Sequence, residues 1–559
     1  MPRSQRVGLS TVFALWVVTM LGGCSNAGPS TGQDPGGAGP QQAAEPKVKR
    51  LVMAVLPPLE EGNDPRAHRG NSSWVYRPFY EYLVGMDPQT GKSIPQLATE
   101  WKLQPDGKSF LFKLRQGVKF HRDRGEFGPD ALTDTFKLQT RDPTVSTYEL
   151  LFPLIAGIDK LRSDEVLIRL KSSDGTFLST MSEERGVFYM LNAQHFQELG
   201  QPDWQTGPAV GTGPYQFKER ALGEFIRYER VPYQHWRTMP EFPEFEFRFM
   251  KEASTRLASL LTGEVHISVL PSDLKTEAQA RGFKVIPGKV PGLRAFVSFL
   301  CCLMKDRNDV DSGWQHPESP LADARVRRAL SKAIDRTQLN KAYFQGEGEV
   351  MVNHHFHPTL QGWDPSWERR FQDQYGYDPE AAKRLLAEAG YSAAKPVDIT
   401  VVFPSPATSF AGADEMMDAI AGMWRAIGVK ASFITVDLAR RSDMRKTGQF
   451  YNHIELNGTA SDQWTGMTTY GSTQGTCCRG IEIPDADRLL AKIRQTLDEH
   501  AQDAIWRGVG EVVFVQHKEI PLLWIPVEAV TNPQIVADWS FPGRITGAWT
   551  HVFNIKAAR

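Results

Sequence analysis

Residues 94–120 read IPQLATEWKLQPDGKSFLFKLRQGVKF, and apolar residues alternate with polar ones in both halves of this stretch. In the first half Trp101 and Leu103 take alternate positions, and in the second half Phe110 and Phe112 do the same. Because successive side chains of a strand point to opposite faces, each half predicts a strand with one buried face.

The two halves are joined by Pro105, Asp106 and Gly107. Proline fixes a φ that suits a tight turn, and glycine accepts a positive φ without a steric penalty. The stretch therefore predicts an antiparallel hairpin. Any half-buried hairpin would show this pattern, so the spacing alone does not identify a protein class.

Length and charge bound the possible functions. The chain has 559 residues, of which 41% are hydrophobic, with 64 Lys and Arg against 65 Asp and Glu. This length predicts two large lobes or three smaller domains rather than one core. The near-zero net charge argues against a nucleic-acid partner, and the sequence has no long acidic tail of the kind found in disordered chains.

Several short strings along the chain share one resemblance. They are Leu83-Val84 with residues 115–121 (RQGVKFH), residues 210–217 (VGTGPYQF), residues 320–330 (PLADARVRRAL) and residues 377–386 (YDPEAAKRLL). Together with the hairpin, they resemble the family 5 extracellular solute-binding proteins, which include the peptide-binding components of ABC importers. The resemblance runs from about residue 75 to the C-terminus and is weaker around residues 455–480.

The resemblance implies an α/β fold like that of the periplasmic binding proteins, with two lobes joined by a hinge and a small extra subdomain inserted in the first lobe. The expected divisions are a first lobe at 47–290 with the subdomain at about 75–205, a second lobe at 291–522, and a return to the first lobe at 523–559.

Local patterns predict further elements. A strand over 398–403, a helix over 414–427 and a strand over 429–436 indicate a βαβ unit. We also expect helices over 74–84 and 323–336. The apolar run 520–525 is expected to return the chain to the first lobe.

The N-terminus has the three parts of an export signal: Arg3 and Arg6, an apolar run over 8–21, and then small residues. Residues 21–24 (LGGC) resemble a bacterial lipobox, which predicts cleavage after residue 23 and lipidation of Cys24. The alternative is an ordinary buried thiol.

Residues 24–46 are rich in Gly, Pro, Gln and Ala and predict a flexible tether. We therefore expect a protein outside the cytoplasm, held to a lipid membrane by its N-terminal anchor.

The family holds its ligand in a cleft between the lobes, and in peptide binders a carboxylate of the second lobe contacts the peptide's ammonium group. Asp462 is the candidate for this role, although this sequence lacks the family's tryptophan after Gly458. Trp464 could line an apolar subpocket. The alternatives are an exposed loop aspartate and a core tryptophan.

Residues 353–357 (NHHFH) raise the possibility of a metal site, because neutral imidazoles bind zinc, nickel or copper. His354, His355 and His357 are weak candidates, since no cysteine or carboxylate stands at a recognised ligand spacing. No metal and no cofactor is therefore expected.

Besides Cys24 the chain has two adjacent pairs, Cys301-Cys302 and Cys477-Cys478. Outside the cytoplasm oxidised cysteines are usual, and neighbouring cysteines rarely bridge each other. We expect one or two bridges between the pairs, with the connectivity open. A four-thiolate metal site is the alternative, and it lacks the usual two-residue spacing.

Common catalytic motifs are absent from the sequence, including Gly-x-Ser-x-Gly and His-Glu-x-x-His. The resemblance therefore implies a monomeric, non-enzymatic receptor that captures a small solute, above all a peptide, and delivers it to an ABC permease in the inner membrane. The alternatives are a nickel-chelate or haem carrier on the same fold and, from another class, an envelope hydrolase.

Overall fold

The computed structural model describes residues 45–559 apart from 59–60, 67–72, 91, 201–205, 291, 307, 406–409, 411, 438–439, 442, 445–446, 460–462, 464–479 and 544–548. Several predicted features lie outside the described residues: the export signal, Cys24, Asp462, Trp464, Cys477 and Cys478. Residues 45–559 form one unit. Among the described residues, no helix has the length and apolar character needed to cross a membrane.

The predicted hairpin is confirmed. Strands β4 (Ala98–Leu103) and β5 (Ser109–Leu114) pair antiparallel, and Gly107 has a φ of 65° in the turn between them. The Asp106 carboxylate accepts hydrogen bonds from the backbone N–H groups of Lys108 and Ser109, each at 2.9 Å. The side chain therefore closes the turn, as aspartate commonly does in such loops.

The hairpin belongs to an inserted subdomain with its own core. Its sheet has the strand order β4-β5-β7-β6, with β6 at Ile155–Lys160 and β7 at Glu165–Leu170. The buried face carries Phe110, Phe112 and Ile168. The associated helices are α1 (Pro129–Thr140), α2 (Ser146–Leu151), α3 (Phe177–Thr180) and α4 (Ala193–Leu199), and the 3-10 turn η2 lies at His121–Asp123.

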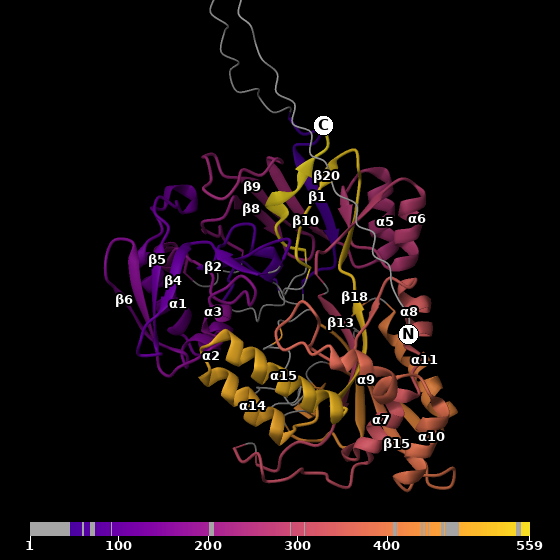
Figure 1. Ribbon diagram of the computed structural model, residues 1–559. Helices are drawn as coiled ribbons and strands as arrows, with labels where there is room; N and C mark the ends of the chain where they lie inside the picture. Colours follow the sequence, from indigo (N-terminus) through magenta and orange to yellow (C-terminus); the bar gives the residue numbers. More distant parts are fainter. Residues whose placement is uncertain are drawn as a thin grey trace, which may run out of the picture. The chain divides into compact units, whose positions relative to one another are not determined.

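The first large sheet has the order β12-β19-β11-β1-β10-β9-β8. Its strands are β1 (Arg50–Val55), β8 (Tyr215–Ala221), β9 (Phe225–Arg230), β10 (Glu244–Phe249), β11 (Ile267–Ser268), β12 (Lys284–Pro287) and β19 (Glu528–Thr531). One face packs on α5 (Ala253–Thr262) and α6 (Ser272–Ala280), and the other on an aromatic core. We call this sheet, its helices and the inserted subdomain the first lobe (Figure 1).

A glycine corner joins the subdomain to this sheet. Gly213 donates its N–H to the carbonyl of Phe79 at 3.0 Å. The buried His121 ring spans the corner, with Nε2 2.8 Å from the carbonyl oxygen of Gly213 and Nδ1 accepting the N–H of Gly211 at 3.2 Å. A neutral imidazole with its proton on Nε2 satisfies both contacts. Burial lowers the pKa of His121 to about 3.

This pKa predicts an acid-sensitive stability. Below pH 6.5 the unfolded chain protonates His121, whereas the folded chain does not until about pH 3, so stability is complete above pH 6.5 and is lost as the pH falls toward 3. His121 should contribute a loss of about 1.4 kcal/mol per pH unit in the free energy of unfolding. Urea unfolding at several pH values measures the slope, and His121→Gln should remove this contribution. Equal slopes in the two proteins would contradict it.

The second large sheet has the order β14-β18-β13-β17-β15-β16. Its strands are β13 (Leu293–Leu300), β14 (Glu349–Val350), β15 (Asp398–Ser405), β16 (Lys430–Asp437), β17 (His453–Thr459) and β18 (Glu519–Ile525). The predicted βαβ unit is confirmed, because β15 and β16 are parallel and α11 (Ala413–Ala426) connects them.

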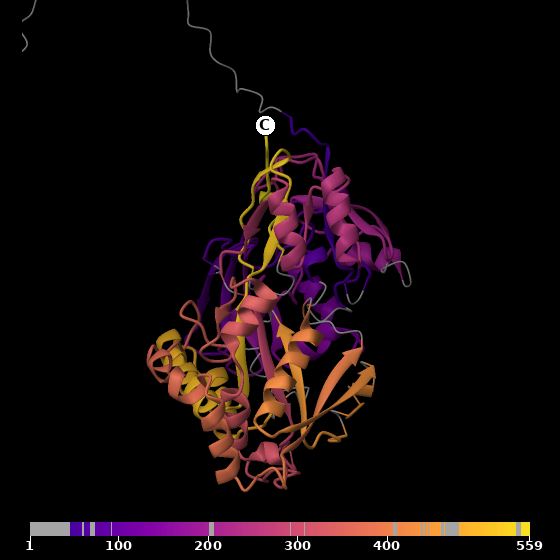
Figure 2. The same cartoon turned by 90° about the vertical axis from the view of Figure 1, so that its right-hand side faces the viewer.

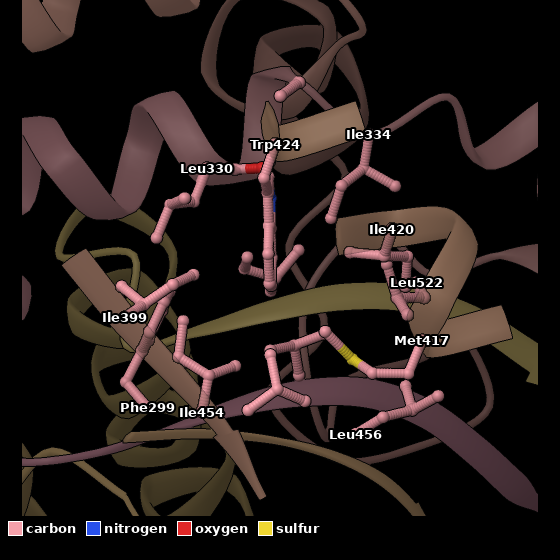
Figure 3. Close-up of a cluster of buried hydrophobic side chains, with 14 of the residues drawn as sticks. Phe299, Leu330, Ile334, Ile399, Met417, Ile420, Trp424, Ile454, Leu456 and Leu522 are labelled. Carbon is pink, nitrogen blue, oxygen red and sulfur yellow. The ribbon is translucent and has the colours of Figure 1, made fainter. Parts of the chain in front are cut away.

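Helices α7 (Ala324–Lys332), α8 (Arg336–Phe344), α10 (Pro379–Glu388) and α11 pack on one face of this sheet. Trp424 stands at the centre of their shared core, and its Nε1–H donates to the carbonyl of Leu330 at 2.9 Å (Figure 3). A buried indole needs such a partner for its N–H.

A separate core holds α9 (Ser366–Tyr375), α14 (Pro484–Gln495) and α15 (Glu499–Val515) together, with Trp367 and Phe356 at its centre. We call the second sheet and helices α7 to α15 the second lobe. Figure 2 shows its orange strands and helices beneath the magenta and indigo elements of the first lobe.

The structure also has several short elements. They are β2 (Val84–Met86) paired with β3 (Ser93–Pro95), β20 (Val536–Asp538) paired with β21 (Lys556–Ala557), and the 3-10 turns η1 (Ser73–Val75), η4 (Pro320–Ala322) and η5 (Val552–Asn554).

Two predicted elements are wrong, and a third is shorter than predicted. The helix over 74–84 does not form beyond η1, because the carbonyls of Pro78 and Phe79 accept from residues of the distant glycine corner instead of from a helix. The helix over 323–336 forms as α7 but ends at Lys332, and a second helix, α8, begins at Arg336. The run 520–525 lies in the second sheet as β18, and β19 is the strand that returns to the first sheet.

Candidate functional site

The second sheet has a polar face opposite the core in Figure 3. Alternate residues of β13 from Ala295 to Phe299 join that core, so Arg294, Phe296 and Ser298 lie on the other face. The register places Glu455 of β17 and Glu519 of β18 beside Ser298, and directly paired residues share a face. We call the following buried set the polar face: Arg294, Phe296, Ser298, Glu455, Asn457, Glu519 and Trp524.

Two predicted residues pack on this face. The ring centroids of His354 and Phe296 lie 3.8 Å apart, and those of His354 and His355 lie 3.7 Å apart. Nδ1 of His354 is hydrogen-bonded to the Glu519 carboxylate. Nη1 of Arg294 lies 2.7 Å from Nδ1 of His355. His355 has a φ of 69°, a left-handed conformation that directs the loop over β13.

The hydrogen bonds fix where the protons lie. Burial lowers the pKa of His354 to about 4 and that of His355 well below 6.5, so both rings are neutral at pH 7. Burial opposes the charge of Glu519, but its interactions with His354 and Lys518 prevail and lower its pKa. An ionised carboxylate only accepts and a guanidinium only donates. Nδ1 of His354 therefore carries a proton, and Nδ1 of His355 is an acceptor.

The ligand atoms of His354, His355 and Glu519 lie within 4.8 Å of one another, which is close enough to consider a metal ion. The electrostatics oppose one, because Arg294 and Lys518 already place two positive charges beside the cluster. The planes of the two imidazoles are tilted by 38° to each other, and Nδ1 of each ring is already occupied by a hydrogen-bond partner, Glu519 or Arg294.

His357 does not join this cluster. Its ring bonds to Thr359 at 2.8 Å and lies 3.3 Å from Glu349. The arrangement favours a hydrogen-bonded network over a metal centre.

The rest of the polar face is also paired. Arg441 is hydrogen-bonded to the Glu455 carboxylate, and Nδ2 of Asn457 donates to the Ser298 hydroxyl at 3.1 Å. Sequence reasoning missed these residues and Glu519. The usable signal was a charged residue within a strand pattern, as in HIELNGT and EIPLLWI, since a buried charge requires a partner.

The predicted ligand residues Asp462 and Trp464 lie outside the described residues. The described chain places the end of β17 at Thr459, paired with Arg294. Thr459, the last described residue before Asp462, is therefore paired with a residue of the polar face.

The cysteine prediction is wrong for the first pair. Cys301 is bonded to Cys302, so neither forms the expected bridge to Cys477 or Cys478, which lie outside the described residues. Cys302 has a φ of 59°, and the two Cα atoms are 3.8 Å apart. This left-handed turn brings the adjacent side chains to one side.

The two lobes also touch beside the strands that connect them. Lys275 on α6 is hydrogen-bonded to Glu347 of the second lobe and lies 2.6 Å from Glu528 on β19. Thr276 donates to the Gln345 side chain at 2.8 Å. These contacts tie the first lobe to the loop after α8.

Comparison with known proteins gives one consistent result. Residues 92–476 match the family model described as bacterial extracellular solute-binding proteins, family 5 Middle. The dipeptide-binding protein of Escherichia coli is 28% identical over 488 residues, covering 82% of this chain and 85% of that protein. Heme-binding protein A of Haemophilus influenzae is 28% identical over 403 residues, covering 68% of each.

The fold is shared with solved structures. The crystal structure of the dipeptide binding protein from Pseudoalteromonas sp. SM9913 in complex with Met-Leu superposes with a TM-score of 0.72 at 21% identity. The superposition covers 91% of this chain and all of that one. The predicted two-lobed α/β fold of periplasmic binding proteins is thereby confirmed.

Proposed function

Because this chain belongs to family 5 of the bacterial extracellular solute-binding proteins, we propose that it captures a short peptide between its lobes and delivers it to an ABC permease. Membership makes the protein an extracytoplasmic solute-binding component of a transporter and not an enzyme. What we propose beyond family membership is that the solute is a peptide. One observation carries it: the similarity to a dipeptide-binding protein extends over 82% of this chain.

We assign the amine-binding role to Asp462 and an apolar subpocket to Trp464. The support is topological, since β17 ends at Thr459, shortly before Asp462 in the sequence, and Thr459 is paired with the buried Arg294. A carboxylate that pairs with a desolvated ammonium makes a strong contact, because removing either partner strands the other charge.

Mass spectrometry of the ligand that co-purifies with a chain beginning at Ser25 tests the proposal. Mild denaturation should release a set of short peptides. A single metal complex, glycan or lipid would overturn the peptide and leave the transport role in place.

Replacing Asp462 by alanine should weaken Met-Leu binding by about 2–5 kcal/mol, measured by isothermal titration calorimetry. Asp462→Asn should retain the hydrogen-bonding shape and lose most of the affinity. Asp134→Ala, on the exposed side of α1, is the control and should bind as the parent does. Unchanged affinity in Asp462→Ala would remove this residue from the site.

A second candidate is a metal-chelate or haem carrier. The similarity to a haem-binding protein over 68% of the chain favours it. The same mass spectrometry separates the two candidates. A haem or metal complex in place of peptides would select the carrier.

We further propose that Cys24 is lipidated and that residues 25–46 tether the folded unit to a membrane. The support is the LGGC string after an export signal. Cys24→Ser should move the protein from the membrane fraction of its host to the soluble fraction. The variant cannot carry the acyl chains, and two or more of them are needed for stable anchoring. Equal retention of the variant would exclude the anchor.

A further inference from the structure

A second contact between the lobes lies far along the chain from the connecting strands. Gly175, in the loop between β7 and α3, donates its N–H to the carbonyl of Arg494 at 2.7 Å. Nε2 of Gln502 donates to the carbonyl of Gly175 at 3.2 Å and to that of Thr496 at 2.6 Å. In Figure 1 the turn between α14 and α15 lies beside the subdomain that carries this loop.

The contact completes a helix end. The last carbonyls of a helix lack partners within it, and α14 ends at Gln495. The first lobe therefore caps a helix of the second lobe through the N–H of Gly175. Asp174 holds its own loop by accepting the N–H of Thr176 at 2.8 Å, so the capping group is fixed in place.

Only glycine fits at this position when the lobes touch. A Cβ on Gly175 would lie 2.2 Å from the carbonyl oxygen of Thr496, 2.2 Å from Nε2 of Gln502 and 2.9 Å from the carbonyl oxygen of Ile493. All three atoms belong to the second lobe. An alanine there is therefore blocked by the partner lobe and not by its own loop.

The composition of this contact allows the lobes to separate. The subdomain core around Phe112 and the helix core around Trp367 share no residue within the described chain. The polar part of the contact is one backbone hydrogen bond, the hydrogen bond from the Gln502 side chain and a 3.9 Å ion pair between Asp174 and the half-exposed Arg494. Polar interfaces of this kind between domains permit relative motion.

We propose that the Asp174–Thr176 loop and the α14–α15 turn form a latch that holds the lobes closed over the solute, with Gly175 as the residue that permits closure. This rests on the proposed capture of solute between the lobes. Water replaces the latch bonds when the lobes open, so the latch sets how long the solute stays bound. Affinity differences within one binding site arise mostly from dissociation rates.

Four full-length proteins test the latch: the parent, Gly175→Ala, Gln502→Ala and the control Gly128→Ala. Gly128 lies in the same subdomain, and a Cβ there meets nothing within 4 Å. Small-angle X-ray scattering measures the radius of gyration, amide hydrogen exchange measures protection at residue 175, and stopped-flow fluorescence measures Met-Leu dissociation.

Gly175→Ala should raise the radius of gyration. It should also speed Met-Leu release about tenfold or more, because the hydrogen bonds of Gly175 to the second lobe are lost. Gln502→Ala should act in the same direction from the other lobe and keep the test valid if Gly175→Ala folds poorly. Gly128→Ala should match the parent. Parent-like scattering and release in both latch variants, or an equal change in the control, would overturn the latch.

Failure of the peptide proposal gives a different result. If the parent does not bind Met-Leu, the peptide assignment fails, while scattering and amide exchange still decide the latch. Protection at residue 175 that is no greater in the parent than in Gln502→Ala would then overturn it.

Discussion

Replacing Glu519 by alanine is expected to lower the free energy of unfolding by about 3–5 kcal/mol. The carboxylate is 1% exposed, is hydrogen-bonded to His354, and lies 3.8 Å from the ammonium of Lys518, which is also 1% exposed. Removing it takes away the negative charge that these buried groups face. Urea unfolding followed by tryptophan fluorescence at pH 7 measures the loss.

Two variants sharpen this measurement. Glu519→Gln keeps an acceptor for His354 without the charge, so its loss should fall between those of the parent and Glu519→Ala. Asp159→Ala removes an exposed partner of Arg169, and exposed ion pairs contribute little because water screens them. If Glu519→Ala lost no more stability than Asp159→Ala, the network would not hold the second lobe together.

Replacing Gly211 by alanine should cost about 3 kcal/mol or more, the upper end for an overpacked site. A Cβ there would lie 1.9 Å from the carbonyl oxygen of Phe79 and 2.6 Å from Cδ1 of Tyr80. The backbone of Phe79 cannot move aside as a flexible side chain can. The neighbouring hydrogen bond between Gly213 and Phe79 also fixes the distance between the two segments.

The measurement is again urea unfolding, with Gly128→Ala as the matched control because its Cβ meets nothing within 4 Å. The loss of stability in Gly211→Ala should appear as a lower urea concentration at the midpoint of unfolding, with an unchanged dependence of the free energy of unfolding on urea. A midpoint equal to that of the control would show that the corner tolerates a side chain.

Elements whose signals are local were predictable. The hairpin over 98–114 and the βαβ unit over 398–437 follow from alternation, helical spacing and turn chemistry within a few residues. The segment 74–84 was not predictable in this way. Its carbonyls accept hydrogen bonds from the glycine corner, more than a hundred residues away, and this pairing replaces the helix.

Part of the candidate site was also predictable from the sequence, and part was not. His354 and His355 stand out in the sequence as neighbouring imidazoles, which suggested a metal. Their protonation depends on Glu519 and Arg294, from β18 and β13, and only the folded sheet brings these charges to the rings. A buried charge shifts the pKa of neighbouring groups, and the spacing of residues in the sequence does not show which charges will be neighbours.

The sequence by itself determined the family, the two-lobed α/β class and the solute-binding role through the resemblance of its short motifs to family 5, and these motifs are local properties of the chain. Only the tertiary structure decided the polar face, the bond between Cys301 and Cys302 and the contact of Gly175 with α14. Each depends on backbone direction or on residues far apart in the chain, and their free energy arises only when folding removes water from between them.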